Sequence, residues 1–175
     1  RECMAALQRV YMPDVEGVWE YKTTSNLPEI SGIKGKFTCK EPLQNAHGVV
    51  RVNNTYHFAY DDGTPFIPLG TTAYAWIHQE KELVERTIET LSKNAFNKIR
   101  MCVFPKHYDF NHNEPPIFAY ERKSDGAFDH FRFNVYFFRY LEGLILRLRE
   151  LSIEADIILF HPYDRWGFSD MVSEA

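Results

Sequence analysis

The stretch Tyr56–His78 reads YHFAYDDGTPFIPLGTTAYAWIH and joins two different sequence patterns. Aromatic residues alternate with smaller or polar ones as far as Tyr60, and Asp62-Gly63 then supplies a tight turn, so this part predicts a β-hairpin. The second arm starts near Phe66 as an apolar run and leads into a helical pattern, which is typical of the first strand of a parallel α/β layout. We therefore expect one domain to close and a second domain to open within this stretch.

The residues before this stretch predict short antiparallel strands separated by turns, at Gln8–Met12, Val18–Thr23 and Gly35–Cys39. Val18–Thr23 shows the clearest alternation, with Trp19 and Tyr21 on one face. Two or three strands are too few for a stable sheet protein. We therefore expect residues 1–52 to be the C-terminal strands of a β-sandwich whose other strands lie upstream of Arg1.

The residues after this stretch alternate between helical and strand patterns. A helix is predicted from Gln79 to about Ala95, followed by a buried strand over 96–104. Asn134 is a good N-cap for a second helix that runs to Leu151, and Asp156–Phe160 predicts a third buried strand. The order β-α-β-α-β indicates parallel strands with right-handed crossovers. It fits the first half of a doubly wound sheet or the opening of a (β/α)8 barrel, which would occupy residues 53–175.

Composition excludes several classes of function. The chain has 45% hydrophobic residues and a formal charge of -4, which is typical of a folded protein and argues against a nucleic-acid partner. No apolar run is long enough to cross a membrane. GxGxxG, P-loop and G-x-S-x-G motifs do not occur, and neither the three cysteines nor the histidines match a zinc motif. We therefore expect neither a cofactor nor a metal.

Candidate binding residues follow the ends of the predicted parallel strands, because the carboxyl ends of such strands form binding sites in α/β proteins. The connection 105–133 is unusually long and rich in aromatic residues and histidines, which suit the apolar faces and hydroxyls of sugars. The same rings also suit a small core that packs this loop. We expect substrate to contact Trp76, His78, Arg100, His107, Tyr108, His161, Tyr163 and Asp164.

Two of these candidates have alternative interpretations. His161 also fits a cap that bonds to the backbone at a packed strand end. Arg100 lies in an apolar strand, where an unpaired charge is costly, and so it needs a carboxylate partner. That partner fits a barrel interior near the active site, and Arg100 equally fits an outward side chain that passes a helix.

Several ordered runs carry a family resemblance: YMPDVEGVWEYKTTSN, HGVVRV, HFAYDDGTPFIPLGTTAYAWIHQ, FNKIRMCVFP and ILFHPYDRWGFSDM. Together they resemble bacterial apiosidase-like glycoside hydrolases. The resemblance implies an immunoglobulin-like N-terminal domain followed by a (β/α)8 barrel related to clan A. It also implies two catalytic carboxylates, an acid/base after the fourth strand and a nucleophile or stabiliser near the seventh.

The predicted strands end with the third, so we expect both catalytic carboxylates beyond residue 175 and no catalytic residue within the chain. The parent protein would hydrolyse O-glycosidic bonds of a plant or microbial polysaccharide, whereas this chain alone would be inactive. The competing hypothesis is a non-catalytic carbohydrate-binding or scaffold protein with a degenerate barrel.

Overall fold

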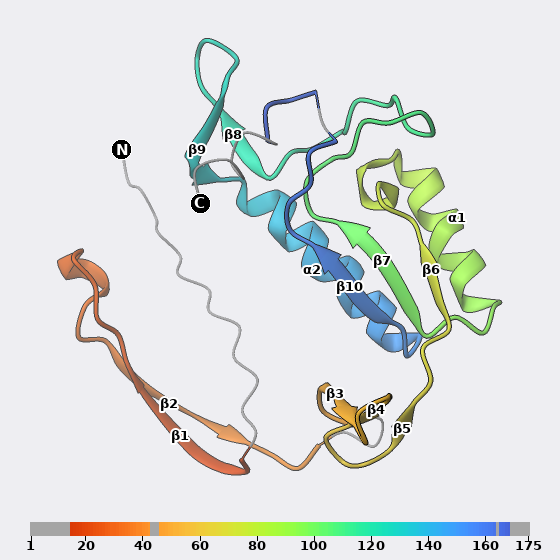
Figure 1. Cartoon of the computed structure of the whole chain (residues 1–175). Coiled ribbons are helices and arrows are strands. Elements are labelled where there is room, and N and C mark those ends of the chain that lie inside the picture. The colour runs from red at the N-terminus through yellow and green to blue at the C-terminus, as the bar shows by residue number, and fades with distance from the viewer. Residues whose placement is uncertain (1–14, 43–45, 164, 169–175) are drawn as a thin grey trace. The chain divides into compact units, whose positions relative to one another are not determined.

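The computed structural model describes residues 15–42, 46–163 and 165–168, and these form a mixed α/β fold (Figure 1). The chain divides into two compact units between Phe66 and Ile67, and each unit is described by itself. The sequence prediction placed the boundary after residue 52, and its assignment of an immunoglobulin-like domain and a barrel stays a prediction. The strand predicted at Gln8–Met12 lies outside the described residues.

The first unit contains a two-stranded antiparallel sheet of β1 (Gly17–Lys22) and β2 (Lys34–Cys39). The 3-10 turn η1 (Pro28–Ile30) lies in the loop between them. Trp19 opposes Phe37 in the register, and the two rings stack with centroids 6.4 Å apart. The period-two pattern therefore correctly predicted a strand here.

The first unit also contains a three-stranded antiparallel sheet of β3 (Val50–Asn53), β4 (His57–Tyr60) and β5 (Pro65–Phe66). The β4–β5 hairpin predicted from the sequence is confirmed. Its turn uses the left-handed backbone of Gly63 (φ 85°), and the Thr64 amide donates to the Asp62 carboxylate at 2.9 Å.

The second unit is built on a parallel sheet of β6 (Gly70–Thr72), β7 (Lys98–Cys102) and β10 (Glu154–Ile158), in the order β10-β7-β6. The predicted parallel pairing is confirmed by the register, in which Thr72 and Asp156 both lie opposite Arg100. β6 and β7 are shorter than predicted, while β10 has the predicted length but begins and ends two residues earlier. The expectation of a buried third strand was wrong, because β10 lies at an edge of this sheet and Ile157 stays 37% exposed.

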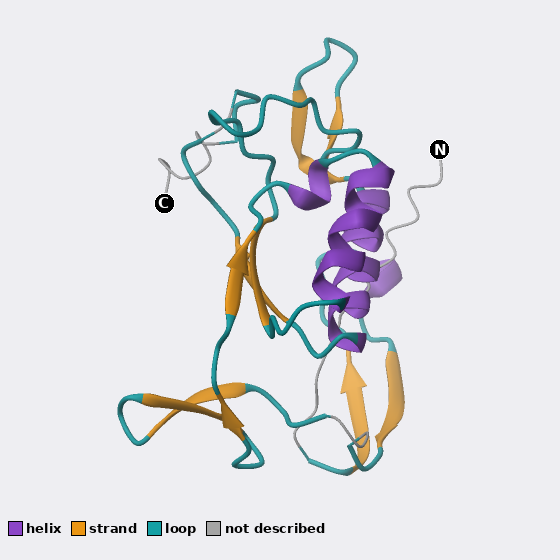
Figure 2. Cartoon of the chain, turned by 90° about the vertical axis from the view of Figure 1, so that its right-hand side faces the viewer, coloured by secondary structure: helices purple, strands orange, loops and turns teal. Residues whose placement is uncertain are grey.

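Both α-helices of the described chain lie on one side of this sheet (Figure 2). They are α1 (Lys81–Ser92), preceded by the 3-10 turn η2 (Trp76–His78), and α2 (Val135–Glu150). The buried residues of α1 and α2 join the inward residues Ile99 and Met101 of β7 in one core. A bidentate pair of 2.8 Å between Arg147 and Glu85 links the two helices at their surface. No helix among the described residues has the length and apolar character of a membrane span.

The connection between β7 and α2 is more ordered than the predicted loop. It contains the antiparallel hairpin of β8 (Tyr120–Arg122) and β9 (Phe128–Phe133). Many of its rings pack against one another, as the alternative interpretation held, and Phe168 lies at the centre of this aromatic cluster, which also includes Phe104, Phe118, Tyr120 and Phe128. Phe110 and Phe131 remain 88% and 97% exposed, so not every ring serves this core.

Replacing Asn134 with alanine is expected to lower the free energy of unfolding by about 1–2 kcal/mol. The Asn134 carboxamide oxygen accepts from the amides of Tyr136 and Phe137 at the start of α2, and its Nδ2 donates to the carbonyl of Phe118 at 3.0 Å. Urea denaturation provides the measurement. Asn134→Asp keeps the capping oxygen and should cost less, so an equal loss in the two variants would contradict the capping role.

Candidate functional site

The segments that follow β6, β7 and β10 lie together at the carboxyl end of the parallel sheet (Figure 1). Backbone hydrogen bonds connect them, because Cys102 donates to Tyr74 at 2.9 Å and His107 donates to Tyr163 at 2.9 Å. Residues far apart in the sequence therefore meet here, as the sequence prediction required.

Lys106 lies among three tyrosine rings at this end of the sheet. Its Nζ atom is 3.6 Å from the ring centroid of Tyr74, 4.6 Å from that of Tyr108 and 4.7 Å from that of Tyr163. Each ring follows a different strand of the sheet, so the charge of one lysine holds three segments together through cation–π contacts. We call Lys106 and these rings the tyrosine cage.

His78 is buried instead of exposed to a substrate. Its side chain is 1% exposed, stacks on Phe137 with centroids 5.9 Å apart, and bonds through Nε2 to the carbonyl oxygen of Cys102 at 3.3 Å. Burial lowers the pKa of His78 to about 4, so the ring is neutral at pH 7. Nδ1 has no partner among the described residues. In this conformation His78 is part of the wall behind the site.

Cys102, which accepts this bond through its carbonyl, is 1% exposed. Burial raises the pKa of its thiol to about 11, so the thiol stays protonated at neutral pH. The thiolate is the reactive form, and Cys102 is therefore a packing residue and not a nucleophile.

His161 follows β10 and bonds to the backbone on both sides of its ring. Its Nε2 lies 3.1 Å from the carbonyl oxygen of Phe104, and its Nδ1 accepts from the amide of Tyr163 at 3.2 Å. A ring that accepts at Nδ1 carries its proton on Nε2, which then donates to Phe104. This geometry matches the backbone-bonded alternative, and it helps to position Tyr163 within the tyrosine cage.

His107 forms a pair with His112, whose Nδ1 lies 3.3 Å from His107 Nε2. The two imidazole rings lie with centroids 5.0 Å apart, and Trp166 meets His107 edge-on with centroids 6.2 Å apart. Among the described residues, no group of three or more His, Cys, Asp or Glu side chains could hold a metal ion.

Arg100 lies in the middle of β7 and not at the carboxyl end of the strand. Its predicted carboxylate partner exists, since Arg100 Nε lies 3.0 Å from Asp156 Oδ2, and Lys98 Nζ lies 3.1 Å from the same oxygen. Because Ile99 and Met101 point toward the helices, Arg100 and Asp156 point to the opposite face of the sheet. Asp164, another candidate, lies outside the described residues.

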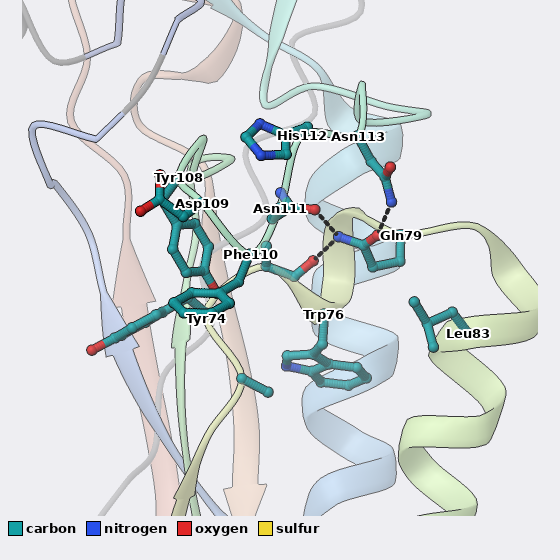
Figure 3. A pocket seen from close by; sticks show the side chains of 12 residues that line it. Tyr74, Trp76, Gln79, Leu83, Tyr108, Asp109, Phe110, Asn111, His112 and Asn113 are labelled. Carbon is teal, nitrogen blue, oxygen red and sulfur yellow. Dashed lines mark hydrogen bonds between the residues drawn. The ribbon is translucent and has the colours of Figure 1, made fainter.

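A depression of about 430 Å³ lies between η2, the start of α1 and the segment 108–113 (Figure 3). Trp76 forms part of its wall and is 4% exposed. Gln79 occupies its centre, where Nε2 donates to Asn111 Oδ1 at 2.9 Å and Oε1 accepts from Asn113 Nδ2 at 2.7 Å. These amides satisfy one another, so they connect the segment after β7 to η2 and form a rigid, polar wall.

Glu114 is a carboxylate near the same end of the sheet that the sequence did not single out for binding. Its Oε2 accepts from Trp166 Nε1 at 3.0 Å and from Arg165 Nη2 at 2.8 Å. The bond from Trp166, together with that from Arg165, lowers the pKa of Glu114 below its ordinary value. Glu114 is therefore ionised at neutral pH and is unsuited to donate a proton as a general acid.

Comparison with solved structures gives a strong match. The chain is similar to a candidate glycoside hydrolase from Bacteroides vulgatus ATCC 8482. The match has 43% sequence identity, a TM-score of 0.84, and covers 90% of this chain and 33% of that protein. This chain therefore spans about a third of the length of the Bacteroides vulgatus protein.

Two further solved structures are similar at lower levels. One is described as a glycoside hydrolase, with 15% identity, a TM-score of 0.47, and coverage of 68% of this chain and 27% of that one. The other is a glycoside hydrolase family 5 protein from Bacteroides vulgatus ATCC 8482, with 14% identity, a TM-score of 0.45, and coverage of 65% and 25%. No protein-family model matches the chain, and no curated protein matches it.

The similarity to the Bacteroides vulgatus candidate glycoside hydrolase at 43% identity agrees with the class of protein expected from the sequence. The tyrosine cage was not predicted. The sequence analysis selected Tyr108 and Tyr163 but omitted Lys106 and Tyr74. One signal was available, because Lys106 follows Pro105 directly at the end of a buried strand, where polar side chains point into binding sites. Gln79, Asn111 and Asn113 gave no such signal, since their role depends on contacts with one another.

Proposed function

We propose that this chain is part of a glycoside hydrolase that cleaves O-glycosidic bonds of a plant or microbial polysaccharide. The observation that carries the proposal is the 43% identity to the Bacteroides vulgatus candidate glycoside hydrolase over 90% of the chain, at a TM-score of 0.84. The resemblance of the runs quoted above supports an apiosidase-like member of this class. The first unit then belongs to an immunoglobulin-like domain, and the second unit forms the first three strands of a (β/α)8 barrel.

The distribution of helices in the second unit supports the barrel. Doubly wound sheets have helices on both faces, whereas a barrel has helices only on its outside. In this unit the described helices lie on one side of the sheet (Figure 2), and the other face presents Thr72, Arg100 and Asp156. In the proposed barrel these polar residues face the interior, and the carboxyl end of the sheet becomes part of the active-site rim.

The chain supplies substrate-binding residues and leaves the catalytic pair to the remaining strands. Glycoside hydrolysis needs one carboxyl group to protonate the leaving oxygen and a second to attack or to activate water. Glu114 is held ionised by Trp166 and Arg165 and does not suit the acid role. We place both catalytic carboxylates beyond residue 175, as the family resemblance implies. In this proposal the wall of the site is formed by His107, Tyr108 and Tyr163. The residues behind this wall are His78, Trp76 and His161. Arg100 contributes from the interior face of the sheet, and Asp164 completes the proposed set.

Assays of the complete protein encoded by the reading frame test this proposal. It is expected to release reducing sugar from at least one plant or microbial polysaccharide, while the 175-residue chain alone releases none. The competing function is carbohydrate binding by a degenerate barrel. It predicts binding without turnover and no glutamate at the end of the fourth strand. Turnover by the 175-residue chain itself would contradict our placement of the catalytic pair.

A further inference from the structure

We propose that the tyrosine cage is a subsite for an anionic sugar, in which Lys106 binds a uronate carboxylate or a sulfate ester. The inference rests on the proposed function and adds the class of substrate. Lys106 follows β7 and lies between the segments that follow β6 and β10. The carboxyl end of such a sheet is where α/β enzymes bind their substrates.

The charge of Lys106 is oriented but not neutralised by the described residues. Within that part of the chain, every carboxylate lies more than 4.0 Å from Lys106 Nζ, and its close contacts are the faces of Tyr74, Tyr108 and Tyr163. Aromatic faces attract an ammonium group but accept none of its hydrogen bonds in the way that an oxygen does. The N–H groups of Lys106 are therefore available to an anionic oxygen.

The tyrosine cage is also accessible from the side of the segment after β10. Tyr163 is 56% exposed and Lys106 is half-buried, so a ligand can approach both side chains from solvent. The flat face of an exposed tyrosine packs against the apolar face of a sugar ring, and the lysine then reaches an anionic substituent. Lys98, which lies in β7 of the same sheet, already forms an ion pair with Asp156.

A neutral sugar would use this site less well. A uronate or sulfate that pairs with Lys106 adds the attraction between opposite charges to the hydrogen bond, whereas a hydroxyl at the same position accepts the hydrogen bond without an ion pair. The alternative role for the tyrosine cage is to hold the three segments together without contacting any ligand.

The test uses the complete protein and measures its affinity by calorimetry for three oligosaccharides of matched length, one neutral, one uronate-containing and one sulfated. The wild-type protein is expected to bind one of the two anionic oligosaccharides more tightly than the neutral one. The oligosaccharide that it prefers identifies the anion as a uronate or a sulfate. Lys106→Met keeps the apolar stem and should lose about tenfold to a hundredfold in affinity for that ligand. Its affinity for the neutral oligosaccharide should fall by a smaller factor, because that ligand loses no ion pair. Lys106→Arg keeps the charge and the ring contacts and should retain most of the affinity.

The remaining outcomes separate this subsite from the proposed function. Unchanged affinity of Lys106→Met for the anionic ligand, or an equal loss for the neutral and anionic ligands, would overturn the subsite. Binding and hydrolysis of neutral polysaccharide alone would overturn it while the glycoside hydrolase function stands. If the complete protein neither binds nor hydrolyses any oligosaccharide, the anionic subsite and the glycoside hydrolase function are both contradicted. If Lys106→Met does not fold, the affinity of the wild-type protein for the anionic ligand is measured between about 50 and 500 mM salt. Salt screens an ion pair, so an affinity that does not change over this range would overturn the anionic subsite.

Discussion

Phe137→Ala is expected to lower the free energy of unfolding of the second unit by about 3–5 kcal/mol, the usual cost of deleting a buried phenylalanine ring. Phe137 is 0% exposed and belongs to the core between the helices and the parallel sheet. Its ring stacks on His78 and meets Phe138 edge-on with centroids 5.3 Å apart. Alanine would leave a cavity behind the carboxyl end of the sheet and remove the packing that fixes His78.

Urea denaturation followed by tryptophan fluorescence measures this loss, because Trp76 and Trp166 both lie in the second unit. Phe131→Ala is the matched control, since Phe131 is 97% exposed and its removal should change stability by less than about 0.5 kcal/mol. Equal effects from the two substitutions would show that Phe137 does not occupy the core described above.

Acidification from pH 7 to pH 5 is expected to remove roughly 2 kcal/mol of stability through His78 alone. Burial lowers the pKa of this ring from 6.5 to about 4 in the folded protein. Below pH 6.5 the unfolded chain takes up a proton that the folded chain does not, so the folded state loses relative stability as the pH falls toward 4. Protonation would also place an N–H at Nδ1, where no described residue accepts it.

The pH dependence is measured as the urea midpoint of the wild type and of His78→Gln between pH 7 and pH 5. Glutamine is uncharged throughout, so the variant should have a flatter profile even if it is less stable at pH 7. Parallel profiles for the two proteins would contradict a buried, neutral His78. Most carboxylates have ordinary pKa values below this range, which limits their contribution to the difference.

Local signals in the sequence predicted the framework of both units. The Asp62-Gly63 turn, the apolar stripe of α1 and the cap at Asn134 each depend on neighbours in the chain, and all three are present. The need of Arg100 for a carboxylate also followed from elementary electrostatics, although its partner Asp156 is 56 residues away. Element ends were less predictable, because the apolar run 96–104 continues beyond the paired residues of β7.

The β8–β9 hairpin has a turn signal in the sequence that the prediction of a loop did not use. Asp125-Gly126 lies between two strand-like runs, and it forms the turn, with Gly126 at φ 86° and the Ala127 amide bonded to Asp125 at 3.0 Å. The many aromatic residues around it instead favoured a binding loop. The tyrosine cage could not be predicted in this way, because its rings come from three segments whose meeting depends on the assembled sheet.

The strand order β10-β7-β6 has a consequence for how the polypeptide leaves the ribosome. β6 is synthesised first, β7 pairs with it next, and β10 then adds to the free side of β7, so spatial order follows the order of synthesis. Each new strand meets a template that already exists, and no earlier strand has to wait for a later one to be inserted beside it. At about 5–20 residues per second, the sheet can grow stepwise over on the order of ten seconds while translation continues.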